Sequence, residues 1–121
     1  MSVLDASAIL AFLLDEEGAE QVEAELESGA QCSAANWSEV AQKSLASGKD
    51  WLAASALLTS YSLVIEPVTV ADAEWAAARW RPGEGLSLGD RLCLALAHRL
   101  GVVCVTTDKA WGDDSGIHQL R

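Results

Sequence analysis

Four acidic side chains of the sequence stand where a strand ends or a helix begins. Asp5 and Asp108 each follow a short apolar run, whereas Glu39 and Asp90 each stand three residues after a good helix-capping residue. Taken singly, each of them is accounted for as a helix cap or a turn residue. In a parallel α/β sheet, however, strand ends and helix starts meet at one edge, so the four carboxylates are expected to lie together there.

Four carboxylates at one edge without a cation would repel one another, and the pKa of at least one of them would rise. A hard cation with oxygen ligands resolves this conflict, and Mg²⁺, or Mn²⁺ in its place, suits such ligands best. Ser7 and Thr106 add hydroxyl groups at the same edge, where they can orient a carboxylate, a water or a phosphate. The sequence therefore predicts a site for a divalent cation.

The elements that must position these residues alternate along the chain. Short strands are predicted at residues 3–4, 31–33, 63–65, 102–106 and 117–120. Helices are predicted at residues 8–14, 17–28, 36–47, 51–61, 69–81 and 87–100, with Asn36 and Ser87 as N-caps. Strands that alternate with helices indicate an α/β fold, a three-layer α/β/α domain with a mainly parallel sheet. The 121 residues fit a single domain spanning residues 1–121.

Composition narrows the class of protein. The net charge of −10, from 18 acidic against 8 basic residues, argues against loose binding of nucleic acid, because phosphate contacts need lysine and arginine. Seven of the acids fall within residues 15–27, where Val22 and Leu26 recur at helical spacing. These acids are predicted to form the solvent-exposed face of an amphipathic helix, away from any substrate.

The cysteines and the apolar segments indicate where such a chain functions. Cys32, Cys93 and Cys104 lie in apolar strand or helix contexts without any C-x-x-C spacing, so buried, reduced thiols are predicted rather than a zinc site. No segment has the pattern of a signal peptide, and no apolar run approaches the ~20 residues of a membrane span. A soluble, cytoplasmic protein is expected.

Four segments of the sequence resemble the PIN-domain nucleases, and in particular the toxins of the VapC type from prokaryotic toxin–antitoxin pairs. They are VLDASAILAFLLDEEGAE, SAANWSEV, LSLGDRLCLALAHRLG and VVCVTTDKAW. Each motif is weak alone, but the four occur in the order of the family and together cover nearly the whole chain. The resemblance implies a PIN-like α/β/α domain.

The resemblance also implies an activity, a cofactor and partners. It implies a Mg²⁺-dependent endoribonuclease in which metal-activated water attacks the phosphate in line, leaving a 5′-phosphate and a 3′-hydroxyl. It implies an antitoxin whose tail covers the site, and a toxin homodimer. The quartet would be Asp5, Glu39, Asp90 and Asp108, of which Asp5 and Asp90 are expected to bind metal directly, with Ser7 and Thr106 as accessory hydroxyls. Asp113 or Asp114 would supply a further acid, and Arg91 and Lys109 are expected to contact phosphate.

Two other interpretations of the acidic residues remain open, a phosphotransfer domain and a non-catalytic interaction module. A Mg²⁺-dependent phosphotransfer domain of the haloacid-dehalogenase type needs a second acid two residues after the first, where this chain has Ser7. A response-regulator receiver needs a mid-chain aspartate at a strand end, which residues 63–67 do not provide. A non-catalytic interaction module would use the acids as caps and as a docking surface, and divalent cations should then not stabilise it beyond a salt effect.

Overall fold

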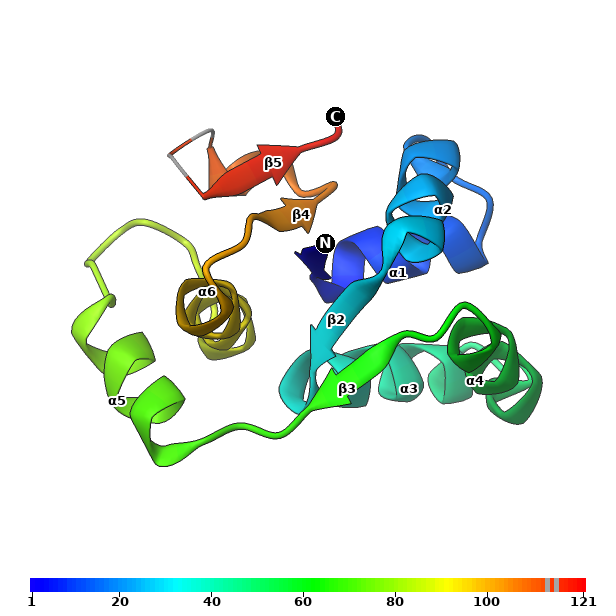
Figure 1. Cartoon of the computed structure of the whole chain (residues 1–121), viewed down its shortest axis with the longest axis horizontal. Helices are drawn as coiled ribbons and strands as arrows, with labels where there is room; N and C mark the ends of the chain where they lie inside the picture. Colours follow the sequence, from blue (N-terminus) through cyan, green and yellow to red (C-terminus); the bar gives the residue numbers. More distant parts are fainter. Residues whose placement is uncertain (113, 115) are drawn as a thin grey trace.

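The computed structural model of the protein describes every residue except 113 and 115. Within this part of the chain, five short strands form one sheet in the order β3-β2-β1-β4-β5, and each neighbouring pair is parallel. The strands are β1 (Ser2–Leu4), β2 (Ala30–Ser33), β3 (Val64–Glu66), β4 (Cys104–Thr106) and β5 (Ile117–Gln119). β1 lies at the centre of the sheet, between β2 and β4 (Figure 1). The predicted parallel sheet is confirmed.

Helices cover both faces of this sheet. They are α1 (Ala6–Leu13), α2 (Ala19–Ser28), α3 (Ala34–Ala46), α4 (Trp51–Ser60), α5 (Val70–Ala78), α6 (Leu88–Leu100) and the 3₁₀ turn η1 (Lys109–Trp111). In Figure 1, α5 and α6 lie on one side of the sheet, and α1 to α4 lie on the other. None of the helices in the described part of the chain is long and apolar enough to cross a membrane.

Alternating side chains of the central strands create two separate cores. Leu4 and Val105 belong to the core that α1, α2 and α3 close, whereas Val3 and Cys104 belong to the core beneath α6. This is the period of two that a strand imposes when both of its faces are buried. The three-layer α/β/α architecture is therefore confirmed.

The start of α3 differs from the prediction. Ser33, not Asn36, is the N-cap: its hydroxyl accepts a hydrogen bond from the amide of Ala35 at 3.2 Å. The helix therefore begins as soon as β2 ends, and Glu39 lies in its second turn rather than its first. Both Ser33 and Asn36 are good capping residues. The Asn36 side chain is buried and binds elsewhere, so the prediction of its capping role was wrong.

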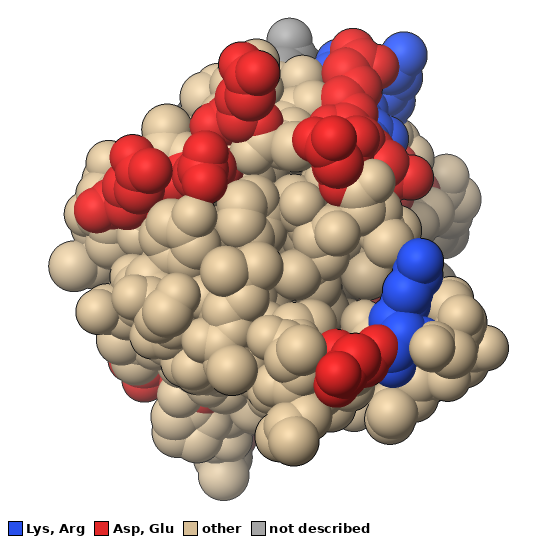
Figure 2. Space-filling view, turned by 90° about the vertical axis from the view of Figure 1, so that its right-hand side faces the viewer, with Lys and Arg blue, Asp and Glu red and all other residues tan. Residues whose placement is uncertain are grey.

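The acidic helix α2 lies on the surface as predicted. Val22 and Leu26 are buried, whereas two of the four acids of α2 are exposed and the other two are partly buried. Figure 2 views the side of the molecule that carries α2 and α4, where the acidic side chains gather toward the upper edge and basic ones are few. Two acids of α2 have local partners, since Tyr61 donates to Glu23 and Ser2 donates to Glu25, both at 2.7 Å. The helix is thus anchored by its apolar stripe and by these two contacts.

The cysteines are buried as predicted, and two of them join elements that carry the site. Cys93 of α6 and Cys104 of β4 lie with their sulfur atoms 2.8 Å apart. Burial raises the pKa of both thiols, which keeps them protonated and unreactive. They therefore act as small core residues that pack the first half of α6 against the start of β4.

A partly buried ion pair joins α5 to α6. Asp72, only 4% exposed, accepts hydrogen bonds from Arg99 Nε at 2.9 Å and from Arg99 Nη2 at 3.1 Å. The hydrogen bond from Arg99 is the main cause of the lowered pKa of Asp72. Asp72 also closes the capping box of α5 with Thr69. The pair fixes the start of α5 against the last turn of α6.

Arg99→Met is expected to lower the free energy of unfolding by about 2 kcal/mol. Loss of one partner leaves the other charge buried and unpaired, which costs about 3–5 kcal/mol, reduced here because Arg99 itself is partly exposed. Urea denaturation at pH 7 measures the change. Arg81→Met is the control, because Arg81 lies 3.8 Å from Glu84 in an exposed pair. Equal losses in the two variants would contradict the role given to Asp72.

Candidate functional site

Asp5 lies where β1 ends and caps the first turn of α1. Its carboxylate is 2% exposed and accepts a hydrogen bond from the amide of Ala8 at 2.8 Å. The Ser7 hydroxyl lies 2.8 and 2.9 Å from its two oxygens, and the Thr106 hydroxyl donates to Oδ2 at 2.6 Å. Both predicted accessory hydroxyls therefore contact the first acid of the predicted quartet.

The surroundings of Asp5 oppose its ionisation. Burial raises its pKa to about 6, although the hydrogen bonds from Thr106, Ala8 and Ser7 lower it, and the negative charge of Asp90 raises it further. A carboxylate that is desolvated, well oriented and next to a like charge is typical of a functional site. At neutral pH it would be stabilised by a nearby cation.

Thr106 connects Asp5 to Asp108. β4 pairs with β1 so that Leu4 lies opposite Val105, which places Thr106 next to Asp5. The fully buried Thr106 Oγ1 accepts from the amide of Asp108 at 3.0 Å. Asp108 caps η1 by accepting from the amide of Ala110 at 2.9 Å, and its side chain is exposed. This half of the site is therefore built on the ends of two adjacent strands.

Glu39 and Asp90 form the other half of the site. Asp90 lies in the first turn of α6, in a capping box with Ser87 that confirms the predicted helix start. Burial is the main cause of the raised pKa of Asp90, and the negative charge of Asp108 adds to it. Glu39 of α3 reaches the same turn, because a Cβ atom added at Gly89 would lie only 2.5 Å from Glu39 Oε1.

The residues present fit a divalent cation. The donor set consists of oxygen atoms, which hard cations such as Mg²⁺ prefer, and Mg²⁺ is usually held by one or two carboxylates while it keeps several waters. Among the described residues, no three acidic, histidine or cysteine side chains lie close enough together to enclose a metal ion. The charge of Asp90 nevertheless acts on Asp5, and that of Asp108 acts on Asp90. A cation between these groups would relieve that repulsion.

The other predicted site residues lie in different surroundings. Asp113 lies outside the described residues. Asp114 is exposed just before β5, at the end of the sheet opposite Thr106. Arg91 donates from Nη1 to the carbonyl of Ala76 at 2.7 Å, which ties α6 to α5. Lys109 is exposed directly after Asp108.

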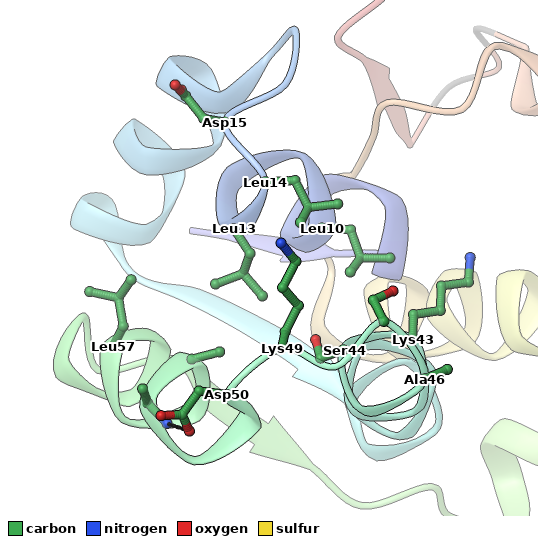
Figure 3. Close-up of a pocket in the computed structure, with 13 residues that line it drawn as sticks. Leu10, Leu13, Leu14, Asp15, Lys43, Ser44, Ala46, Lys49, Asp50 and Leu57 are labelled. Atoms are coloured by element: carbon green, nitrogen blue, oxygen red, sulfur yellow. Dashed lines mark hydrogen bonds between the residues drawn. The ribbon is translucent and has the colours of Figure 1, made fainter.

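A groove of about 720 Å³ lies between α1, α3 and α4 (Figure 3). Its walls include Leu10, Leu13 and Leu57, and none of the four predicted metal ligands lines it. Two lysines stand at its rim. In Figure 3, Lys49 extends toward α1, whereas Lys43 extends from α3 on the side of α6. Lys43 thus lines the groove and is also near enough to the first turn of α6 for its charge to act on Asp90.

The family profile of the PIN domain matches residues 2–113. The chain belongs to the PIN-domain family. PIN domains are generally nucleases that use divalent metals, so the match supports a hydrolase acting on nucleic acid. This PIN domain is similar in fold to a chain in a solved toxin–antitoxin complex from Klebsiella pneumoniae, with a TM-score of 0.75 and 22% identity over 100% of this chain and 98% of that chain. No curated protein matches the sequence.

Sequence reasoning missed two features of this PIN domain. Asn36 was predicted as a cap, yet its side chain contacts Glu39, and Gly89 was assigned no role although it makes room for the Glu39 carboxylate. The spacing of three residues between Asn36 and Glu39 was an available signal, because residues three apart share a helix face. No local signal identifies Gly89, since its constraint comes from α3.

Proposed function

We propose that this PIN domain is a Mg²⁺-dependent endoribonuclease and the toxin of a toxin–antitoxin pair. The observation that carries the proposal is the buried carboxylate of Asp5, whose pKa is raised and which lies within the field of Asp90 at the edge of a PIN-type sheet. The partner is proposed because a protein of similar fold is part of a toxin–antitoxin complex. Mn²⁺ is expected to replace Mg²⁺.

Each residue of the site has a role in this proposal. Asp5 and Asp90 would hold the cation directly, and Glu39 and Asp108 would bind it directly or through its waters. When bound, the cation supplies positive charge that offsets the charge of the attacked phosphate and acidifies water. The hydroxyl groups of Ser7 and Thr106 orient Asp5.

RNA cleavage with and without the cation tests this function. Purified protein free of any partner is incubated with a mixed RNA pool in Mg²⁺ and in chelator, beside Asp90→Asn. Discrete cuts that need metal and disappear in the variant are expected. Cuts that persist in Asp90→Asn would identify a contaminating nuclease and oppose the assignment. Absence of both cleavage and thermal stabilisation by Mg²⁺ or Mn²⁺ would favour the non-catalytic interaction module.

The oligomeric state and the protein partner are part of the same proposal. The protein is proposed to form a homodimer and to be inhibited by an antitoxin that covers the acidic edge. An acidic site can accept lysine or arginine from such a partner, which is the charge complementarity that favours rapid association. Light scattering at several protein concentrations tests the dimer, and loss of cleavage on addition of the purified partner tests the inhibition.

An acidic protein that cleaves RNA needs local positive charge, and Lys43 is the residue best placed to provide it. Four arginines lie within 4 Å of carboxylates: Arg79, Arg81, Arg99 and Arg121. Arg91 is engaged with a backbone carbonyl. Lys43 is exposed, lies one helical turn after Glu39, and its charge partly offsets the rise that burial causes in the pKa of Asp90. We therefore propose Lys43 as a further phosphate contact, and Lys109, which is exposed beside Asp108, keeps the role that was predicted for it.

Lys43→Gln is expected to raise the KM for RNA about fivefold and leave kcat nearly unchanged. The loss of one exposed charge contact costs about 1 kcal/mol. Removal of one phosphate contact should also reduce the slope of log affinity against log salt concentration by about 0.7. Initial cleavage rates give KM and kcat, and RNA binding measured at about 50 to 200 mM salt gives the slope. Lys49→Gln, across the groove, is the control, and an equal change in slope for both variants would refute the assignment.

A further inference from the structure

Asn36 is a buried amide that joins two elements of the acidic site. It is 1% exposed, and its Nδ2 donates to Glu39 Oε1 at 2.8 Å and to the carbonyl of Gly89 at 3.1 Å. Both partners are acceptors, so the orientation of the amide is fixed with nitrogen toward them. The side chain thereby connects the second turn of α3 to the first turn of α6, next to Asp90.

The other end of the amide has no partner. Asn36 Oδ1 is buried and accepts no hydrogen bond from the described residues. An unpaired buried acceptor is unfavourable, and most buried polar groups are paired. An asparagine retained for packing alone would be replaced by an apolar residue without this disadvantage. The amide is therefore best explained by what its nitrogen does for Glu39.

We propose that Asn36 is a positioning residue for the cation site, which holds the Glu39 carboxylate against the first turn of α6 beside Asp90. The inference rests on the cation site of the proposed function and adds to it a residue that does not itself bind the cation. A hydrogen bond to one oxygen of a ligating carboxylate fixes its rotamer and leaves the other oxygen available.

Gly89 provides independent support for this arrangement. A Cβ atom at this position would lie 2.5 Å from Glu39 Oε1 and 3.0 Å from its carboxyl carbon. Gly89 has an ordinary helical backbone, so alanine would otherwise suit the helix better than glycine. Glycine at this position is therefore explained by the space that the Glu39 carboxylate occupies. α3 and α6 fix this carboxylate from two sides, Asn36 by attraction and Gly89 by leaving room.

Calorimetric titration of Mn²⁺ into the full chain tests the inference without measuring cleavage. Asn36→Ala is expected to weaken Mn²⁺ binding about 10- to 100-fold, the usual effect of losing an outer contact to a metal ligand. Because Asn36 acts through Glu39, the double variant Asn36→Ala/Glu39→Gln should bind within about twofold of Glu39→Gln alone. Additive losses would show that Asn36 does not act through Glu39 and would overturn the inference.

Two further variants separate positioning from stability. Ser44→Ala removes another buried polar side chain of α3, away from the acids, and should leave the Mn²⁺ affinity unchanged. Gly89→Ala should weaken Mn²⁺ binding at least tenfold while the melting temperature of the metal-free protein is kept or raised, which makes the test independent of how Asn36→Ala folds. Unchanged binding in Gly89→Ala would contradict the inference.

The same titration distinguishes this inference from the proposed function. Asp90→Asn should abolish Mn²⁺ binding if the cation site is correct. If it does so while Asn36→Ala and Gly89→Ala bind like the unaltered protein, the site stands and the positioning role is refuted. If the unaltered protein binds no Mn²⁺, the cation site and the inference both fail.

Discussion

Asp5→Asn is expected to lower metal-dependent RNA cleavage about 10³-fold and to stabilise the metal-free protein at neutral pH. A catalytic cation contributes several kcal/mol to the transition state, and about 1.4 kcal/mol corresponds to a factor of ten. The same carboxylate is 2% exposed and near the charge of Asp90, so its ionisation opposes folding when no cation is bound. One side chain thus supports activity and reduces stability.

The direction of the pH effect follows from the two protonation states. The pKa of Asp5 is about 6 in the folded protein, against an ordinary value of 3.8. Between these values the folded state keeps a proton that the unfolded state has lost, so stability falls as pH rises. The contribution of Asp5 is fully present below about pH 3.8 and is lost as pH rises through about 6, a loss of about 3 kcal/mol.

Urea denaturation in chelator at several pH values between 4.5 and 7.5 measures this effect. The difference in stability between Asp5→Asn and the unaltered protein should grow with pH and level off above about 6.5. Saturating Mn²⁺ should remove much of the difference, because it stabilises only the unaltered protein. Parallel pH curves in chelator would contradict the raised pKa. Retained cleavage by Asp5→Asn would contradict its place in the site.

Thr106→Val is expected to destabilise the fold by about 2 kcal/mol and to lower cleavage about 10- to 100-fold. Valine has nearly the same shape, so packing is preserved and only the hydroxyl group is lost. That hydroxyl donates to Asp5 at 2.6 Å and accepts from the amide of Asp108 at 3.0 Å. Its removal leaves a partly buried amide unpaired and takes from Asp5 the hydrogen bond that most lowers its pKa.

The neighbouring threonine provides a matched control. Thr107 is also buried, but its hydroxyl makes no hydrogen bond to the described residues, so Thr107→Val should change stability by less than about 0.5 kcal/mol. Thermal denaturation and initial cleavage rates give the two quantities for both variants. Similar losses in the two variants would mean that valine is unfavourable at either position, and that the Thr106 hydroxyl has no special role.

The fold was predictable because local patterns and long-range structure agree over most of the chain. Ser87 and Asp90 form the capping box that their spacing indicates, and the β-branched run before Thr107 contains the buried strand β4. The parallel sheet then follows from alternation with helices, since parallel strands need crossover connections. Such agreement between levels is typical of a sequence that specifies one fold.

The start of α3 was not predictable, because two residues there are equally good N-caps. Ser33 and Asn36 both favour an N-cap position, and nothing nearby in the sequence distinguishes them. The choice is made by α6, whose Gly89 carbonyl accepts a hydrogen bond from Asn36 across 53 residues of chain. The sequence pattern identified the four acids as candidate metal ligands. The contacts that orient those acids depend on helix packing, which single-sequence reasoning cannot supply.

The order of the strands determines when the site can exist during synthesis. β1 is made first, yet its pairing with β4 joins Leu4 to Val105, about a hundred residues later. Translation at about 5–20 residues per second leaves Asp5 without its β4 neighbours for about 5–20 s. Pairing over so long a loop is itself slow. Under the proposed activity, a nascent chain is therefore unable to cut the messenger being translated until the segment through Asp108 has emerged.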